Sequence, residues 1–253
     1  YADLDTSSID ELPPGRQPVR TVAVSDGRRA EVVERVRAAC GSGRQAYWVC
    51  PLIEESEALD YQAAEDTAGR LSQALPELSV GLIHGRMKPA EKERAMAHFK
   101  SGDTQLLVAT TVIEVGVDVP SASLMIIENA ERMGLAQLHQ LRGRVGRGSE
   151  DSTCVLMYRG PLGQIAERRL RIMRETDDGF RIAEADLRLR GPGEVLGTRQ
   201  TGVMALRVAD LLRDQALLPA VRRLADELLA QDDQAAAGLI DRWIGTARRY
   251  GQV

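Results

Sequence analysis

The segment from Gln140 to Gly148 carries the residues whose chemistry is most specific. It places three arginines and three glycines within nine residues, and from Arg132 to Gly148 the chain has four arginines and no Asp or Glu. Arginine presents a permanently charged fork of donors, and glycine lets the backbone approach closely, so such a turn suits a polyphosphate. An arginine of this kind can neutralise charge that develops during phosphoryl transfer, even from a domain other than the one that holds the nucleotide.

The pattern Q-x-x-G-R-x-G-R in this segment resembles the sixth signature motif of superfamily-two helicases. Upstream, the stretch ATTVIEVGVDVP from Ala109 to Pro120 resembles the fifth motif of the same superfamily, at the expected distance. The resemblance implies that Arg144 and Arg147 reach the γ-phosphate of ATP and that Gln140 assists them. An arginine-rich turn on a solvated face, or a generic phosphate site, is the alternative for the arginine segment.

The fifth-motif segment offers groups for nucleic acid and nucleotide. Thr110 and Thr111 end an expected strand, and their hydroxyls can bond a DNA phosphate. Gly116 allows a close approach, and Asp118 can accept a hydrogen bond from a ribose hydroxyl. Loops that leave the carboxyl ends of parallel strands are where α/β domains bind ligands. A threonine cap followed by a turn is the alternative.

A histidine and an arginine follow another expected strand. The sequence His84-Gly85-Arg86 resembles the phosphate-contacting loop of the same superfamily, which implies that His84 and Arg86 contact DNA. A packed or solvated side chain is the alternative for His84. His98 and His139 have no metal-ligating partner at a useful spacing, so we expect them to be structural and expect no metal site in the chain.

The groups that bind and ionise ATP are missing from this sequence. The chain has three lysines, Lys88, Lys92 and Lys100. Each follows Met, Glu or Phe, whereas a phosphate-binding P-loop needs a Gly-Lys-Ser/Thr sequence. The two Asp-Glu pairs, Asp10–Glu11 and Asp226–Glu227, precede Leu-Pro and Leu-Leu and form no acidic box for Mg²⁺. We therefore expect ATP and Mg²⁺ to be held mainly by a first motor lobe that this sequence lacks.

Composition indicates a globular protein of one or two domains, with 253 residues, 43% of them hydrophobic and 28% charged. No apolar run reaches the roughly 18 residues that a membrane helix needs, and no signal peptide opens the sequence. The three cysteines, Cys40, Cys50 and Cys154, are odd in number and lack metal-type spacing. We expect them to be reduced core thiols of a cytoplasmic protein, with no membrane partner.

The net charge of −4 and the pI near 5.6 do not exclude a nucleic-acid partner. Acidic residues are concentrated between positions 51 and 69, where no basic residue interrupts them. The segment 159–199 carries nine arginines against seven acids. A surface that follows phosphates needs only one basic face.

Strand and helix patterns alternate through the first part of the chain. Residues 1–20 are expected to be a connector between lobes, with a Pro-Pro-Gly turn. Helices are expected over 27–40, 59–75, 89–100 and 135–142, and strands over 47–53, 80–83, 106–110, 124–128 and 153–158. Such alternation favours a parallel sheet with helices on both faces. We predict one α/β domain over 21–158.

The pattern after residue 158 contains no evident strand. Helices over 163–174 and 181–190, around the turn Asp177-Asp-Gly179, indicate a helical hairpin. A Gly-Pro-Gly loop at 191–193 and two more helices over 209–230 and 235–248 follow. We predict a separate α-helical domain over 159–253.

The stretch from Asp178 to Gly202 resembles the TRG translocation motif shared by RecG-type helicases and Mfd-type transcription-repair coupling translocases. The segments 128–131, 138–140 and 197–202 are similar to the RecG type, and this similarity extends from about residue 3 to about residue 250. In that family, hairpin arginines and a glutamine of the following loop couple the ATP state to movement of the duplex. The matching positions are Arg171 or Arg174, Arg190 and Gln200.

These resemblances imply a fold and a function. The fold would be a RecA-like parallel sheet flanked by helices, the second helicase motor lobe, followed by a helical TRG hairpin. The function would be that of the C-terminal motor portion of an ATP-dependent translocase on double-stranded DNA, one that reverses stalled forks and branch-migrates Holliday junctions in recombination and repair. Its partners would be branched DNA and the first lobe and wedge domain of the same polypeptide, and the chain alone would be inactive. An Mfd-type translocase and a non-catalytic duplex-binding module are the alternatives.

Overall fold

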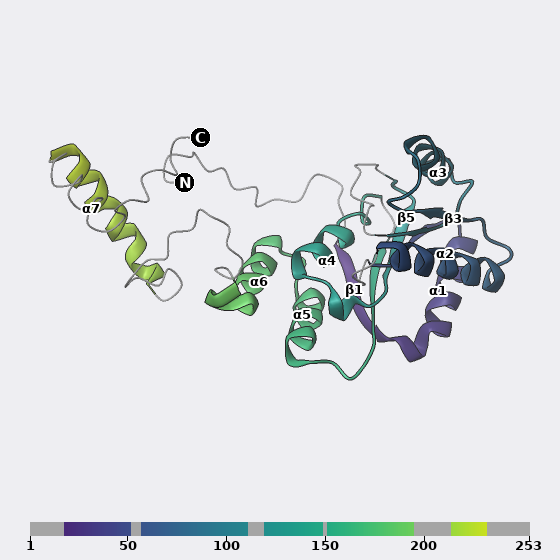
Figure 1. Ribbon diagram of the computed structural model, residues 1–253, viewed down its shortest axis with the longest axis horizontal. Helices are drawn as coiled ribbons and strands as arrows, with labels where there is room; N and C mark the ends of the chain where they lie inside the picture. Colours follow the sequence, from purple (N-terminus) through teal and green to yellow (C-terminus); the bar gives the residue numbers. More distant parts are fainter. Residues whose placement is uncertain (1–17, 52–56, 111–118, 149–150, 195–213, 232–253) are drawn as a thin grey trace. The chain divides into compact units, whose positions relative to one another are not determined.

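The computed structural model describes residues 18–51, 57–110, 119–148, 151–194 and 214–231 (Figure 1). The chain separates into two compact units, Tyr1–Asp186 and Leu187–Val253, and each is described by itself. The predicted division at residues 158 and 159 stays a prediction. The first unit contains the sheet.

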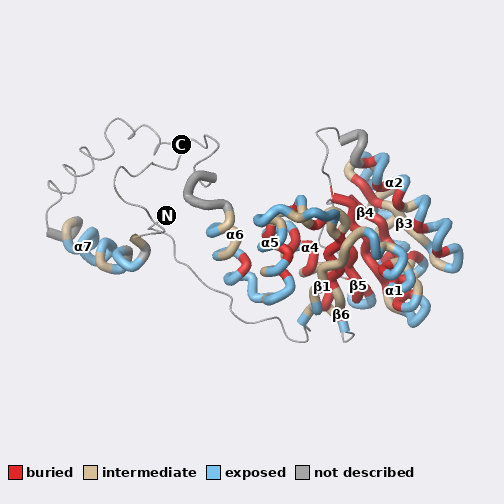
Figure 2. The backbone as a smooth tube through the Cα atoms, turned by 90° about the horizontal axis from the view of Figure 1, so that it is seen from below, coloured by how far each residue is buried: buried red, intermediate tan, exposed pale blue. Residues whose placement is uncertain are grey.

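Six parallel strands form one sheet in the order β1-β6-β5-β2-β4-β3. Their bounds are β1 Val19–Ser25, β2 Gln45–Val49, β3 Val80–Ile83, β4 Leu106–Ala109, β5 Ala122–Ile127 and β6 Ser152–Tyr158. Every residue of β2, β4 and β5 is buried, as expected when helices cover both faces of a parallel sheet. Figure 2 shows this buried centre. The predicted fold class is confirmed.

Five helices connect or follow the strands of this unit: α1 Arg29–Gly41, α2 Glu57–Ala74, α3 Pro89–Ser101, α4 Leu135–Arg142 and α5 Gln164–Glu175. Right-handed crossovers place α1 and α2 on one face of the sheet and α3 and α4 on the other. Neighbouring residues of β2 point to opposite faces of the sheet. Trp48 belongs to the core under α1 and α2, whereas the ring of Tyr47 lies 4.8 Å from that of Phe99 on α3.

Helix α3 has strong local signals at both ends. It begins with Pro89, and the carboxylate of Glu91 accepts a hydrogen bond from the backbone N–H of Lys88 at 2.9 Å. It ends at Gly102, whose φ of +88° is the left-handed conformation that glycine adopts freely. These signals explain why the predicted range agrees with the observed one to within a residue.

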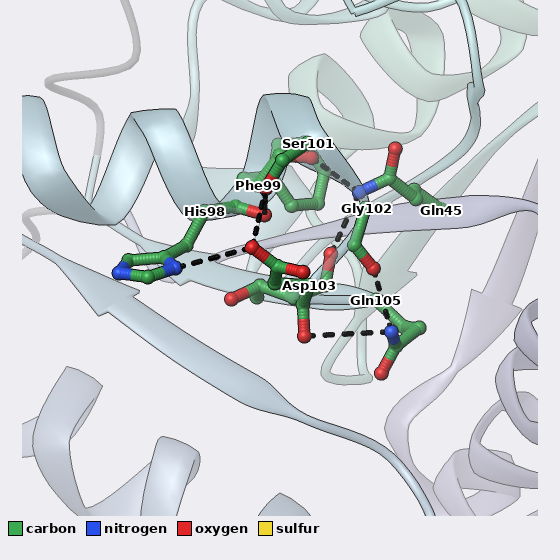
Figure 3. Close-up of polar contacts among 8 residues, drawn as sticks. Gln45, His98, Phe99, Ser101, Gly102, Asp103 and Gln105 are labelled. Atoms are coloured by element: carbon green, nitrogen blue, oxygen red, sulfur yellow. Dashed lines mark hydrogen bonds and ion pairs between the residues drawn. The ribbon is translucent and has the colours of Figure 1, made fainter.

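The turn after α3 is tied to the start of β2 by side chains (Figure 3). Gln45 Nε2 donates to the carbonyl oxygens of Phe99 at 2.5 Å and Thr104 at 2.6 Å. His98 faces Asp103, with Nδ1 3.4 Å from the carboxylate, and Ser101 donates to the same carboxylate at 2.7 Å. The contacts of His98 are thus with its own turn.

Most element boundaries differ from those predicted by one or a few residues, and three of the differences are informative. Strand β1 begins inside the stretch predicted as a connector, because pairing with β6 orders a short, half-buried run whose own pattern is weak. Strand β2 ends at Val49 rather than residue 53, since both of its ladders stop there and Pro51 has no N–H to continue them. Helix α6 runs from Gly179 to Glu194 and so includes the Gly-Pro-Gly predicted as a loop; adding a turn to an existing helix needs no new nucleus.

The predicted helical hairpin is present as α5 and the first part of α6. Between them, the Asp178 carboxylate accepts hydrogen bonds from the N–H groups of Phe180 at 2.8 Å and Arg181 at 3.3 Å. This caps the start of α6. In the second unit, α7 spans Leu218–Gln231 and overlaps the helical range predicted over 209–230. The other predicted helix, over 235–248, lies outside the described residues.

Candidate functional site

The arginine loop, Gly143–Gly148, follows α4 and is tightly packed. The N–H of Arg144 donates to the carbonyl of Leu141 at 3.0 Å, which continues the helical turn. Gly146 has a φ of +82°. A Cβ at Gly148 would overlap the carbonyl oxygen of Pro120. The loop therefore lies against the residues that lead into β5, and its last glycine cannot carry a side chain without moving backbone.

The three residues predicted to act on ATP lie on this helix and loop. Gln140 is exposed on α4, and Arg144 and Arg147 are half-buried in the loop. Arg147 Nε lies 3.4 Å from the carbonyl oxygen of Gly143. The structure thus places these residues on one short segment at the amino end of the sheet. Their action on a γ-phosphate stays a prediction.

Arg142 is the remaining arginine of the segment from Gln140 to Gly148. It points into the protein and is only 4% exposed. Its Nη1 donates to the carbonyl oxygens of Met173 at 3.1 Å and Thr176 at 2.9 Å, and its Nη2 lies 3.3 Å from His139 Nδ1. The last carbonyls of a helix have no partner within the helix, so Arg142 completes the C-terminal end of α5. It joins the arginine loop to the hairpin.

Sequence reasoning did not assign Arg142 this role, although a signal for it exists. Leu135, Leu138 and Arg142 are spaced three and four residues apart, so they share one face of α4. Both leucines are fully buried. An arginine that continues a buried helical face is expected to satisfy its donors inside the protein.

His84 and Thr110 lie together at the carboxyl ends of β3 and β4. The N–H of Thr110 donates to the carbonyl of Ile83 at 3.2 Å, and both residues are more than nine-tenths buried. His84 Nε2 is 3.5 Å from the Glu65 carboxylate. His84 Nδ1 and Thr110 Oγ1 are buried and have no hydrogen-bond partner within the described ranges. Buried polar atoms of this kind indicate a place for a polar ligand.

The loop that contains His84 and Arg86 is held by side chains of α2 and α3. The ring of Tyr61 lies 5.2 Å from the His84 ring and 5.5 Å from the exposed Arg86 guanidinium. A Cβ at Gly85 would approach the Tyr61 hydroxyl to 2.6 Å, so glycine is required for this packing. From α3, Lys92 Nζ donates to the Gly85 carbonyl at 2.8 Å.

The predicted contacts therefore fall at two ends of the sheet. His84, Arg86 and Thr110 follow strands at the carboxyl end, whereas the arginine loop lies beside Pro120 at the amino end. Residues 111–118 connect the two ends. The predicted residues Thr111, Gly116 and Asp118 belong to this connection and lie outside the described residues.

The candidate coupling arginines of the hairpin differ in their surroundings. Arg171 forms an i,i+4 ion pair with Glu167 at 2.8 Å. Arg174 is exposed and forms no ion pair with any described residue. The guanidinium of Arg169, in the same helix, donates to the carbonyl of Met133 at 2.5 Å and so fastens α5 to the chain before α4. Arg190 lies in α6, its side chain is not described, and Gln200 lies outside the described residues.

Glu128 is a second residue that sequence reasoning did not assign. At the carboxyl end of β5, its carboxylate accepts hydrogen bonds from Arg29 Nη2 and Trp48 Nε1, both at 2.5 Å. The Arg29 guanidinium also lies 5.0 Å from the centre of the Trp48 ring. The cluster joins α1, β2 and β5, and it is held by opposite charges and hydrogen bonds.

The three cysteines are buried, as predicted. Burial raises the pKa of Cys40 to about 11 and the pKa values of Cys50 and Cys154 to about 12, so all three thiols are protonated at neutral pH. In the described part of the chain, no group of three or more His, Cys, Asp or Glu side chains is placed to hold a metal ion. No helix there is long and apolar enough to cross a membrane.

Comparisons with known proteins cover nearly the whole chain. The family model of the helicase conserved C-terminal domain matches residues 30–149, and the model of the ATP-dependent DNA helicase RecG, domain 3, C-terminal, matches residues 176–240. The chain is 65% identical to the ATP-dependent DNA helicase RecG of Escherichia coli O157:H7, over 99% of this chain and 36% of that relative. It is 61% identical to the helicase of the same name from Pasteurella multocida, over 100% of this chain and 37% of that relative.

One solved structure is similar in both sequence and fold. RecG bound to a three-way DNA junction shares 49% identity with this chain at a TM-score of 0.67. The match covers 86% of this chain and 28% of that one. The chain thus spans little more than a third of the length of the curated relatives named above.

Proposed function

Because this chain is a RecG-type helicase sequence, we propose that it forms the C-terminal motor portion of an ATP-dependent translocase on double-stranded DNA. In this proposal it works within a longer polypeptide that also carries a first RecA-like lobe and a wedge domain. The whole enzyme reverses stalled replication forks and branch-migrates Holliday junctions during recombination and repair. The observation that carries the proposal is the 65% identity that extends over 99% of the chain, hairpin included.

ATP is the nucleotide of this proposal. Arg144 and Arg147 are suited to a γ-phosphate because they are half-buried arginines on a glycine-rich loop whose last residue, Gly148, packs against Pro120. They would neutralise charge on the transferred group, with Gln140 assisting and Asp118 accepting from the ribose. ATP supplies the free energy for movement when its terminal phosphate is transferred to water. Since the described residues form no metal-holding group, we assign Mg²⁺ to the first lobe.

DNA would lie at the carboxyl end of the sheet. His84 and Thr110 offer buried polar atoms there, and Arg86 is exposed next to them. Phosphate contacts from such groups position a duplex without reading its sequence. The related RecG bound to a three-way junction supports branched DNA as the substrate.

Arg142 would connect the nucleotide end to the hairpin. It is the last residue of α4, directly before the arginine loop, and it holds the last carbonyls of α5, so a shift of the loop on ATP hydrolysis would move α5 with it. The hairpin arginines, including Arg190, and the segment around Gln200 would then act on the duplex. This is a mechanical path through packed elements, which is one physical way to couple two sites.

Two other functions fit the motor sequence less well. An Mfd-type translocase shares the motor, and a non-catalytic duplex-binding module would need only the fold. The RecG-specific match over 176–240 favours the RecG type over both. For this function, we propose a cytoplasmic location in association with the bacterial nucleoid.

The proposal is tested by comparing the full-length polypeptide with the 253-residue chain. We expect the full-length protein to hydrolyse ATP when branched DNA is added and to convert a model fork into a four-way junction. The 253-residue chain alone is expected to show no turnover. Binding of RNA polymerase by the full-length protein, without fork reversal, would support the Mfd type. DNA-stimulated turnover by the purified chain, free of contaminants, would contradict the assignment of ATP binding to another lobe.

A further inference from the structure

A cleft of about 950 Å³ lies between α1 and the edge strand β1. Its floor is apolar and includes Val22 and Val24 of β1 and Val155 of β6. Its wall is the side of α1 from Arg28 to Ala39, and its far end reaches the C-terminal end of α5. The cleft is separate from the arginine loop and from His84 and Thr110, none of which lines it.

The charge around this cleft is unbalanced. Six arginines and three acids line it. Arg28 pairs with Glu31, and Arg142 is occupied by the carbonyls at the end of α5. The other four form no ion pair with any carboxylate in the described part of the chain: Arg20, Arg35, Arg44 and Arg174. An anionic ligand would find four guanidinium groups that form no ion pair, although the charge of Arg35 also acts on the Glu31 carboxylate in the same helix.

A buried hydroxyl also lines the cleft. Ser123 is 2% exposed, and its Oγ has no hydrogen-bond partner among the described residues. A buried polar atom without a partner is uncommon in native proteins and needs a reason. A hydrogen-bonding ligand in the cleft would supply the partner. This observation is independent of the arginines.

Strand β1 has one open edge. It pairs with β6 on one side, and no described residue pairs with it on the other. Proteins usually protect such an edge with proline, lysine, a bulge or a covering loop. Strand β1 contains neither proline nor lysine, and its pairing with β6 runs in regular register over all seven residues. The edge is therefore suited to receive another strand.

We propose that this cleft binds an extended acidic segment of a partner protein, in which acidic and apolar residues alternate. Its backbone would pair with the open edge of β1. Its apolar side chains would pack beside Val22 and Val24 of β1, and its carboxylates would meet the arginines that form no ion pair. The site goes beyond the proposed motor function, because neither ATP nor the predicted DNA contacts use it.

The cleft favours a peptide over nucleic acid. Its lining contains no aromatic side chain on which an unpaired base could stack. A sugar-phosphate backbone has no group that would continue a β-ladder or cover a valine floor. The chain's own residues before β1 are poor strand partners, because Pro13, Pro14 and Pro18 lack the N–H groups that a ladder needs.

The test measures fluorescence anisotropy of a labelled peptide in which Asp and Val alternate, added to the 253-residue chain. We expect saturable binding that weakens as salt is raised. Arg35→Glu is expected to weaken it by about tenfold or more, since hydrogen bonds to charged groups are lost and a repulsion is added. Arg94→Glu is the matched control, because Arg94 is also an exposed helical arginine, but it lies on α3 beside β3 at the other edge of the sheet. It should leave binding unchanged.

Backbone pairing is tested with the same peptide methylated on alternate backbone nitrogens, which keeps its charge but removes ladder donors. Loss of binding by one of the two methylation patterns supports strand addition. Three outcomes would each overturn the proposal. The two methylated peptides could bind equally well, Arg35→Glu and Arg94→Glu could have equal effects, or the unsubstituted chain could fail to bind the unmethylated peptide.

Other occupants are separated by two further measurements. If Arg35→Glu weakens binding of a labelled DNA duplex more than that of the peptide, the cleft binds DNA and the proposal is wrong. A variant with Asp3→Asn, Asp5→Asn, Asp10→Asn and Glu11→Gln reports on the chain's own acidic segment. Peptide affinity at least tenfold higher in this variant would show that the chain's own segment fills the cleft, whereas unchanged affinity supports a partner.

Discussion

Replacing Arg142 by methionine is expected to separate ATP hydrolysis from movement on DNA. The change keeps much of the length and apolar volume of the side chain but removes the guanidinium that donates to Met173 and Thr176 at 3.1 and 2.9 Å. The contact between Arg142 Nη1 and Thr21 Oγ1, at 3.5 Å, is too long to contribute much to stability. Two charge-assisted hydrogen bonds at the end of α5 are therefore lost.

The size of the effect follows from these two bonds. Hydrogen bonds to a charged group contribute about 1.5–3 kcal/mol each. Thr176 is half-exposed, so water can replace Arg142 as the donor to its carbonyl oxygen. Met173 is buried, so its carbonyl oxygen would be left without a donor. Removing a buried charge also returns part of its desolvation cost. We expect a net loss of about 2–3 kcal/mol in the free energy of unfolding, or roughly 5–10 °C in Tm for a domain of this size.

The assays are thermal melting of the 253-residue chain and a comparison of two rates in the full-length protein. Fork reversal should fall more than ATP turnover, measured well below the melting temperature, because the C-terminal end of α5 loses its hydrogen bonds to the residue that precedes the arginine loop. Arg171→Met is the matched control for thermal melting only, because Arg171 is itself a candidate coupling residue. Arg171 is exposed and paired only within its own helix, so its loss should change stability by less than about 0.5 kcal/mol.

The reasoning is refuted if Arg142→Met melts at the same temperature as Arg171→Met. Equal loss of ATP turnover and fork reversal would leave Arg142 a structural role but remove the coupling role. Recovery of stability, but not of the fork-reversal rate, in Arg142→Lys would show that the shape of the guanidinium matters and not the charge alone.

Three further predictions concern the loop and the segment after the hairpin. In the full-length protein, Arg147→Ala should lower ATP turnover by about 10³–10⁵ with little change in KM, because an arginine finger acts on transition-state charge; a change confined to KM in steady-state kinetics would make Arg147 a binding residue. Gln200→Ala should leave DNA-stimulated ATP turnover intact and abolish fork reversal, and equal retention of both rates would remove Gln200 from the coupling path. Gly148→Ala should lower the Tm of the 253-residue chain, since its Cβ would overlap the backbone of Pro120, whereas Gly41→Ala, where the added Cβ meets nothing within 4 Å, should not; equal melting temperatures for the two would contradict the packing described for the loop.

Much of the first unit could be predicted from local sequence. The apolar, β-branched runs that became β4 and β5 are fully buried inside the parallel sheet, and such runs differ clearly from helical patterns. Pro89 marked the start of α3 because its backbone preference is intrinsic to the residue. The arginine loop was identified for a similar reason, since its residue types and spacing are local.

The sequence did not predict the edge strand β1 or the end of β2, because both depend on partners distant in the chain. Strand β1 is ordered by β6, whose residues are more than a hundred positions away. A half-buried edge strand carries only a weak alternating pattern of its own. Its open side, and the cleft beside it, appear only once the strand order is known.

The sequence by itself determined which residues could handle phosphate, and tertiary structure decided which of them face inward. Arg142 and Arg144 are two positions apart in one motif, yet Arg142 is buried against the end of α5 while Arg144 is half-buried in the loop. The contacts of Arg142 reach Met173 and Thr176, more than thirty residues away. Residue type sets the charge and the donors of a side chain, but its partners are set by packing between distant segments, which local sequence does not encode.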